Sequence, residues 1–264
     1  PEVRALLRLI QCEFLKLKRK RLFQAAFLTT FIMPVLYSLL LSDSSFDDLM
    51  SVIREENGFL LLIPLTVVLA ANLFFEEHDY DTLKNLMCVP VTKGRLTMAK
   101  LFVLLIFDIA YEAAGYMIAA AMSVISGIRL EEAGQQLILT LATGVLLWAA
   151  PMPCIFIVVW CNKSYIISVI IAFAYVTLNY ILRINDSFLM VPAGLNLPTF
   201  LPVPMIFRWL YQFHSIENVG EVLAEFYERF QPYFISGPLV FTVLLSEAAV
   251  CIALIIQVYK KQDV

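Results

Sequence analysis

Charged residues are scarce in this sequence. They make up 16% of its 264 residues, whereas hydrophobic residues make up 61% and the mean hydropathy is +0.81. A soluble domain usually carries about 25% charged residues, because polar groups must cover much of its surface. The shortage excludes a soluble enzyme, a disordered chain and a free-standing nucleic-acid-binding protein, and it indicates a protein embedded in lipid.

Motifs for nucleotide, hydrolase and metal chemistry are missing as well. The nine glycines form neither a GxxxxGK[ST] loop nor a GxGxxG turn, so the chain has no recognisable phosphate cradle. Only two histidines occur, no GxSxG elbow is present, and the five cysteines form no CxxC pair. We therefore expect no catalytic residue, bound cofactor or metal site in this chain.

Long apolar stretches dominate what remains. Each is close to the roughly 20 residues that cross a bilayer as a helix, and none shows the alternation of a membrane β-strand. They cover residues 23–41, 58–75, 100–127, 134–160, 165–182 and 234–259. The expected fold class is all-α: a polytopic membrane protein with six transmembrane helices in a single domain over 1–264. Pro151 and Pro153 should interrupt the fourth helix.

The basic residues predict the orientation of these helices. Fourteen Lys and Arg residues fall in the termini and loops of one side, and five in those of the other. Since cytoplasmic segments retain basic residues, both termini and the 76–100 loop are predicted to be cytoplasmic. With the acidic residues included, the net charge is +7 inside, −7 outside and −3 within the spans. This assignment places Arg54, Glu55 and Glu56 in an outer loop.

The first 22 residues show the spacing of an amphipathic helix. Apolar side chains recur three or four residues apart, and basic side chains crowd the end of the segment. We interpret 1–22 as an interfacial helix in contact with membrane lipid; the alternative is a plain basic anchor before the first span. The apolar positions are Val3, Leu6, Leu7, Ile10, Phe14 and Leu17.

The 76–100 loop orders its charges, with acidic residues first and basic residues last. Asp81 or Thr82 can cap a short helix that ends before Pro90, and Thr92 can cap a second helix that continues into the third span. A compact helix–proline–helix loop on the cytoplasmic face suits docking to a soluble partner, although an ordinary charged connector has the same composition.

This loop resembles the cytoplasmic loop of ABC-2-type transporter permeases. That family typically shows an acidic residue, a Gly/Asn-Thr-Leu-like step, a leucine pair, Pro-Val-Ser/Thr-Arg/Lys and a closing lysine. The stretch matches at Glu76 or Glu77, Thr82, Leu83, Leu86, Pro90, Val91, Thr92, Lys93 and Lys100. Asp81 departs from the small residue that is common there. The six spans, the N-terminal helix and the basic tail extend the resemblance over the whole chain.

The resemblance implies a role as the permease subunit of an ATP-driven ABC exporter in a bacterial plasma membrane. An ABC ATPase subunit, expected as a dimer, would hold ATP and Mg, and a second permease chain, identical or homologous, would complete the assembly. The general appearance is closest to lantibiotic-immunity and bacitracin-resistance permeases. The residues expected to couple to the ATPase are Glu77, Thr82, Leu83, Leu86, Pro90, Thr92, Lys93 and Arg95.

Three carboxylates lie within the predicted spans. Asp108 and Glu112 are four residues apart and share one face of the third helix, and Glu247 lies midway along the last. Each costs about 2.5–3.5 kcal/mol at a helix centre. They are interpreted as a cation-attracting pathway or a subunit contact, with protonated structural hydrogen bonding as the alternative. A membrane enzyme or a secondary transporter could use the same three residues, although no basic relay partner is evident within the predicted spans.

The last outer segment, 183–235, is long and rich in proline and aromatic residues. Between 216 and 230 an apolar stripe and an acidic face predict an amphipathic helix. The acidic residues Glu217, Glu221, Glu225 and Glu228 are candidates to attract a cationic peptide; the alternative is a solvated helix face. Together with the subfamily resemblance and the −7 outer charge, they predict removal of a cationic, amphipathic antimicrobial peptide from the membrane.

Overall fold

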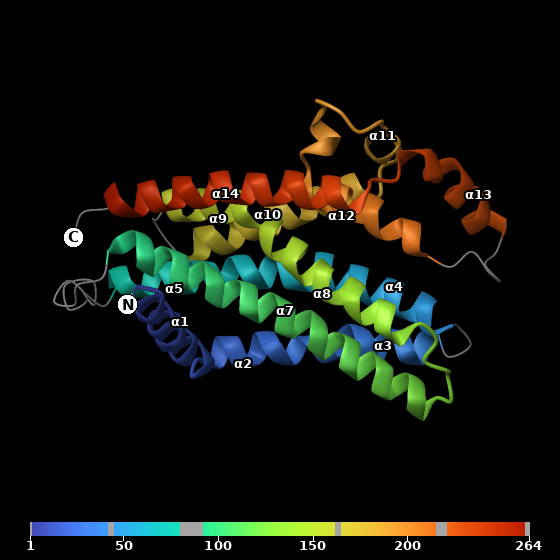
Figure 1. Cartoon of the computed structure of the whole chain (residues 1–264), viewed down its shortest axis with the longest axis horizontal. Helices are drawn as coiled ribbons and strands as arrows, with labels where there is room; N and C mark the ends of the chain where they lie inside the picture. Colours follow the sequence, from blue (N-terminus) through green and yellow to red (C-terminus); the bar gives the residue numbers. More distant parts are fainter. Residues whose placement is uncertain (1, 42–44, 80–91, 162–164, 215–220, 262–264) are drawn as a thin grey trace.

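The structure is a computed structural model that describes residues 2–41, 45–79, 92–161, 165–214 and 221–261, with backbone alone for 2–5 and 76–79 (Figure 1). Within these ranges every regular element is helical. The elements are α1 Glu2–Lys18, α2 Arg21–Leu28, η1 Thr29–Phe31, α3 Ile32–Leu40, α4 Phe46–Glu56, η2 Asn57–Leu62, α5 Ile63–Asp79, α7 Lys93–Ile125, α8 Ala133–Ala149, α9 Met152–Cys161, α10 Tyr165–Arg183, α11 Asp186–Leu189, η3 Leu197–Thr199, α12 Pro202–Leu210, η4 Tyr211–Phe213, α13 Glu221–Phe230, η5 Gln231–Tyr233 and α14 Gly237–Lys261.

Six helices, some of them interrupted, are long and apolar enough to span a membrane, which confirms the predicted all-α polytopic fold. They run over Arg21–Leu40, Phe46–Phe75, Lys93–Ile125, Ala133–Cys161, Tyr165–Arg183 and Gly237–Lys261. The second, third and fourth spans form the buried centre of the bundle, whereas the first, fifth and last leave broad apolar faces exposed. Such faces suit lipid or another apolar helix.

Helix ends from distant parts of the chain gather at two opposite ends of the molecule. The start of α1, the end of α5, the start of α7 and the end of α14 all lie at one end of the molecule (Figure 1). We call this the basic end, because Lys16, Lys18, Lys260 and Lys261 lie in the last turns of α1 and α14. Helices α11, α12 and α13 gather toward the opposite end.

Helix α4 begins at Phe46, twelve residues before the predicted start of the second span at residue 58, so the prediction of a loop over residues 46–57 is wrong. Ser45 caps α4 by accepting a hydrogen bond from the Asp48 amide at 3.1 Å. Phe46, Leu49, Met50 and Ile53 then form a buried stripe against Ala119 of α7. The charges at positions 47–56 concealed this stripe, whose spacing is nevertheless that of a helix.

Prolines account for the irregular turns inside the spans. Pro64 has no amide hydrogen, and its ring crowds the carbonyl of the residue four positions earlier; the preceding turns widen into the π-helix η2. Pro34 stands in the same relation to the 3₁₀ turn η1. Around Pro151 the fourth span breaks into α8 and α9, as predicted.

The N-terminal segment forms the predicted amphipathic helix, α1. Leu17 is buried and Ile10 and Phe14 pack against the core, whereas Leu7 is exposed. Phe14 meets Phe23 edge-on at 6.2 Å, which sets α1 against the beginning of the first span. Contact of this helix with lipid remains a prediction.

Within the outer segment, the predicted 216–230 helix is observed as α13, and residues 216–220 lie outside the described ranges. Helix α12 is buried along its whole length and packs between α10 and α14. This part of the segment is therefore integrated into the bundle.

Candidate functional site

The 76–100 loop joins the end of α5 to the start of α7, and we call these two helix ends its stems. Thr92 caps α7 by accepting from the Arg95 amide at 3.4 Å, as predicted. Lys93 and Arg95 place cations at a helix N-terminus, where the helix dipole disfavours them. The two cations therefore do not stabilise α7 through the helix dipole.

The rest of the candidate coupling set is not described. Thr82, Leu83, Leu86 and Pro90 lie outside the described residues, and for Glu77 only the backbone in α5 is described. Their proposed role in coupling stays a prediction.

Lys100 ties the two stems together. Its side chain is fully buried, and its Nζ donates to the backbone carbonyl of Leu73 in α5. The ammonium also lies 5.1 Å from the ring centroid of Phe74 and 5.9 Å from that of Tyr259 in α14. A single residue thus links α7, α5 and α14.

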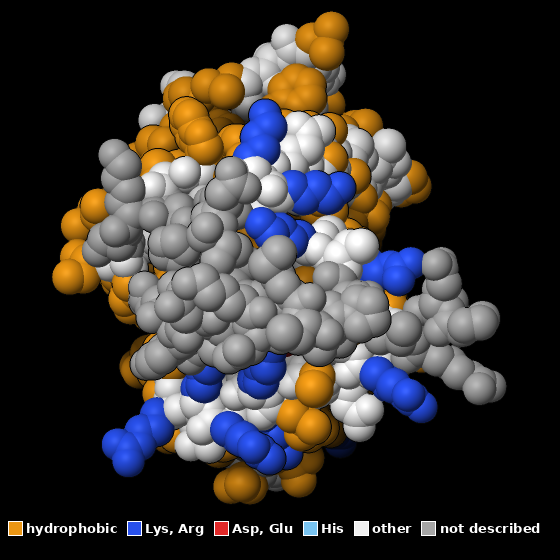
Figure 2. Space-filling model, turned by 90° about the vertical axis from the view of Figure 1, so that its left-hand side faces the viewer, with side chains coloured by type: hydrophobic (Ala, Val, Ile, Leu, Met, Phe, Trp, Pro, Cys, Tyr) orange, Lys and Arg blue, Asp and Glu red, His pale blue; other side chains and the backbone are white. Residues whose placement is uncertain are grey.

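Basic side chains are spread across this end of the molecule. Figure 2 shows Lys and Arg side chains on both sides of the central area, among hydrophobic and uncharged ones. Gly94 lets the start of α7 approach α14, because an added Cβ would lie 3.5 Å from Ile256 and 3.6 Å from Lys260. The start of α7 and the basic end of α14 are therefore neighbours.

The intramembrane carboxylates form a pair and a separate residue. Asp108 and Glu112 are buried on α7, and Thr66 of α5 donates to Asp108 Oδ1 at 2.6 Å. Glu247 is only partly buried on α14 and interacts electrostatically with Tyr175 and Cys251. Because the three carboxylates are not assembled, the geometry does not favour a shared catalytic or relay site.

Polar groups from the interrupted turns surround the pair. Thr30 of η1 donates to the Tyr111 carbonyl at 3.1 Å, and Thr29 Oγ1 lies 2.9 Å from the Tyr111 hydroxyl. The same hydroxyl donates to Asn57 Oδ1 of η2 at 3.4 Å. Both irregular turns therefore face the same stretch of α7.

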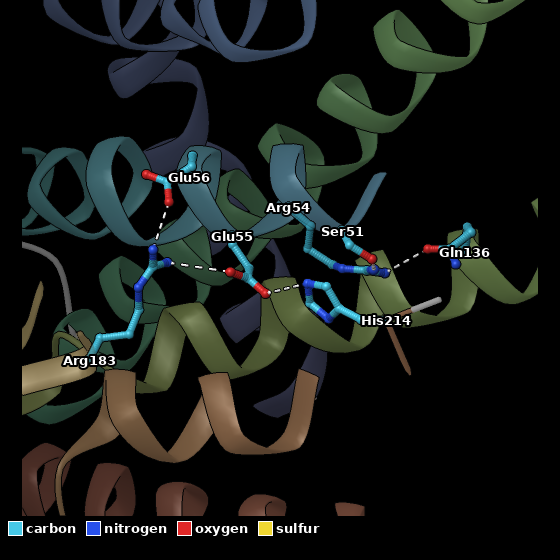
Figure 3. A network of polar contacts seen from close by, with 7 residues as sticks. All are labelled: Ser51, Arg54, Glu55, Glu56, Gln136, Arg183 and His214. Carbon is cyan, nitrogen blue, oxygen red and sulfur yellow. Dashed lines mark hydrogen bonds and ion pairs between the residues drawn. The ribbon is translucent and has the colours of Figure 1, made fainter. Parts of the chain in front are cut away.

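Figure 3 shows a polar network that the sequence-based assignment missed. Arg183 at the end of α10 pairs with Glu56 at 2.7 Å and with Glu55 at 3.6 Å. His214 Nε2 lies 3.2 Å from Glu55 Oε1. The network joins α4, α10 and the turn after α12 at the end of the bundle opposite the basic end.

Arg54 extends this network toward α8. It donates to Gln136 Oε1 at 3.0 Å and to Ser51 at 3.5 Å (Figure 3). The Gln136 amide in turn donates to Asp47. Recognising that the apolar stripe from Phe46 to Ile53 is helical would have placed Arg54 in the bundle. Its partner Gln136, 82 positions away in the chain, has no local signal.

Aromatic rings attach the outer helices to this network. Tyr211 stacks on His214 with centroids 4.3 Å apart and contacts Phe226 and Phe230 of α13 at 5.5 and 5.4 Å. Burial, with smaller contributions from Glu55 and Tyr227, raises the pKa of Tyr211 to about 12. The ring therefore stays neutral and holds α13 next to the Glu55–His214 pair.

Helix α13 presents an acidic face to solvent. Glu221, Glu225 and Glu228 are exposed, and Glu217 lies outside the described residues. Val222 and Leu223 are exposed on the same helix. The outer surface of α13 therefore combines carboxylates with apolar side chains.

These features define a helical, multi-pass membrane protein with a basic end organised around the loop between its second and third spans. Residues 9–179 match the family described as ABC-2 family transporter protein, and the match extends from α1 through most of α10. No curated protein matches the chain significantly. The chain belongs to the ABC-2 transporter family: it is a permease subunit of an ABC transporter, located in a bacterial plasma membrane, and it works with an ABC ATPase subunit.

Proposed function

We propose that this permease is part of an exporter that removes an amphipathic, cationic antimicrobial peptide from the membrane, for self-protection or resistance. The observation that carries the proposal is the separation of charge between the ends. The basic end holds the coupling loop, and the acidic face of α13 lies toward the other end.

In this proposal the basic end faces the cytoplasm. A dimeric ATPase that binds ATP and Mg docks under the loop, and a second permease chain, the same or homologous, completes the pathway. Nucleotide binding changes the affinity of the ATPase for the loop, and this difference moves the spans between inward-facing and outward-facing states. Lys100 is placed to transmit that movement, because it connects both loop stems to α14.

Purification tests the docking step. We expect an ATPase encoded beside this chain to co-purify with it, and Leu83→Asp with Leu86→Asp to reduce the recovered ATPase by about tenfold, because apolar docking surface becomes charged. The matched control is Leu195→Asp, since Leu195 is 99% exposed and lies between α11 and η3, far from the loop in the sequence. Full transport by the permease with no ATPase present would reject the proposal.

A second experiment tests the acidic face of α13. Glu217, Glu221, Glu225 and Glu228 changed together to Gln should weaken protection against a cationic peptide several-fold, and the difference should shrink at high salt as charges are screened. Cell survival against increasing peptide concentration measures the effect. Glu131→Gln with Glu132→Gln changes exposed carboxylates between α7 and α8 and serves as control. Unchanged protection at equal expression would show that the face is only solvated.

A further inference from the structure

The carboxyl group of Glu112 occupies a crossing between α7 and the π-helix η2 that two glycines make possible. A Cβ added to Gly58 would lie 3.5 Å from Glu112 Oε1, and one added to Gly115 would lie 2.9 Å from Asn57 Nδ2. Each helix thus inserts a polar side chain opposite a glycine of the other. The Glu112 and Asn57 side chains are 2% and 1% exposed.

Hydrogen bonding at this crossing is incomplete. Glu112 Oε1 and Asn57 Nδ2 are both buried without a hydrogen-bond partner among the described residues. A buried polar atom without a partner costs about 1–3 kcal/mol, and an ionised one costs more. Such a cost is expected where a group changes its partner or its charge during function.

The groups that act on Glu112 come from two helices. Arg54 of α4 is the cation that attracts it, and Asp108 and Tyr111 of α7 are the other titratable groups that interact with it. Gly58 of η2 faces the Glu112 carboxyl, and Leu147 of α8 packs against the same glycine. Arg54 is one turn before η2, so a basic partner for the carboxylate does lie within the spans, contrary to the sequence-based expectation.

This arrangement gives Glu112 two ways to be neutralised. The carboxylate can be balanced by Arg54, which also hydrogen-bonds Gln136 and Ser51 and interacts with the Glu55 and Asp47 carboxylates. Alternatively, Glu112 can take up a proton and leave Arg54 to those groups. The π-helix between Arg54 and α5 is a segment whose turns can rewind, and such segments occur frequently at functional sites. A change in the Arg54–Glu112 attraction therefore acts on the geometry of the second span.

We propose that Glu112 is a proton-binding site of the membrane domain, loaded and emptied during the transport cycle, with Arg54 as the cation that replaces the proton. The reaction is a simple ionisation: the proton leaves the carboxyl oxygen for water, and the electron pair of the O–H bond stays on the carboxylate. The inference uses neither the identity of the exported substrate nor the assignment of the coupling residues.

Infrared titration of the purified chain in lipid tests the site without an ATPase or a substrate. We expect a pH-dependent carboxyl C=O band that disappears in Glu112→Gln and persists in Glu247→Gln, the matched change on α14. Arg54→Gln should bind the proton about tenfold more tightly, because the competing cation is gone, whereas Arg54→Lys should stay close to the wild type. A spectrum unchanged by Glu112→Gln, or a band displaced by Na⁺ at constant pH, would overturn the proposal.

The pH profile of ATP hydrolysis by the assembled transporter tests the link to the cycle. We expect a step at the midpoint of the infrared band, lost in Glu112→Gln and retained in Glu247→Gln. A step that persists in Glu112→Gln would refute loading during the cycle. Failure of any ATPase to bind would instead count against the proposed function and would leave the infrared result standing.

Discussion

Arg183→Ala should lower the free energy of unfolding by about 3–5 kcal/mol, because it removes the cation from buried carboxylates. Arg183 pairs with Glu56 at 2.7 Å and with Glu55 at 3.6 Å, and it is 8% exposed. Its guanidinium also lies 5.2 Å from the Phe59 ring centroid and 5.1 Å from that of Phe207, so the variant loses packing as well as charge. Chemical denaturation in detergent, followed by tryptophan fluorescence, measures the change.

The structure supplies a matched control for this variant. Arg229 forms an ion pair of the same 2.7 Å length with Asp186, but both side chains are more than half exposed. Arg229→Ala should therefore cost no more than about 1 kcal/mol. Adding Glu55→Gln and Glu56→Gln to Arg183→Ala should recover part of the lost stability, since no buried carboxylate then remains unpaired. Equal losses for the two arginine variants would show that burial does not strengthen the Arg183 network.

Lys100→Met should lower transport per ATP hydrolysed by about tenfold while the chain still assembles with its ATPase. The substitution keeps an apolar stem of similar length and removes the charge-assisted hydrogen bond to the Leu73 carbonyl, which is worth about 1.5–3 kcal/mol. Without it, α5 and α7 can move independently when the ATPase changes state. Substrate transport and ATP hydrolysis measured in the same proteoliposomes give the ratio.

Lys18→Met is the control for a general loss of positive charge at the basic end, because Lys18 is exposed in the last turn of α1. We expect a ratio close to that of the wild type. If both lysine variants lower the ratio of transport to ATP hydrolysis equally, attraction between the basic end and the ATPase explains the loss. The link that Lys100 makes between α7 and α5 then does not explain it.

Much of the architecture was predictable because it depends on local physical rules. Six apolar segments of spanning length are hydrophobic whatever they pack against, and Pro151 interrupts a helix in any surroundings. Thr92 caps α7 for the same local reason. The acidic helix was predicted from its own periodicity and is observed as α13, beginning at Glu221.

The candidate site was less predictable, because its groups come from distant parts of the chain. Glu55 and Glu56 seemed suited to an outer loop. Their low exposure is explained by the ion pairs that they form with Arg183, which lies more than 120 residues later in the chain. Asp108 and Glu112 were recognised as a pair by their spacing, but neither Thr66 nor Arg54 could be assigned to them beforehand. Glu247 looked equivalent to them in sequence and lies apart in space.

The amino-acid sequence by itself determined that the chain lies in lipid, how many spans it has and where the loop between the second and third spans falls, because transfer into lipid and helix termination act on contiguous residues. The tertiary structure alone decided which charged and polar groups pair with one another. A charge inside a membrane is tolerated only beside a partner, and partners such as Arg183 with Glu56, or Arg54 with Gln136, become neighbours only when the helices pack. Several of the scarce charges that first indicated a membrane protein are, in the folded chain, buried where its helices pack together.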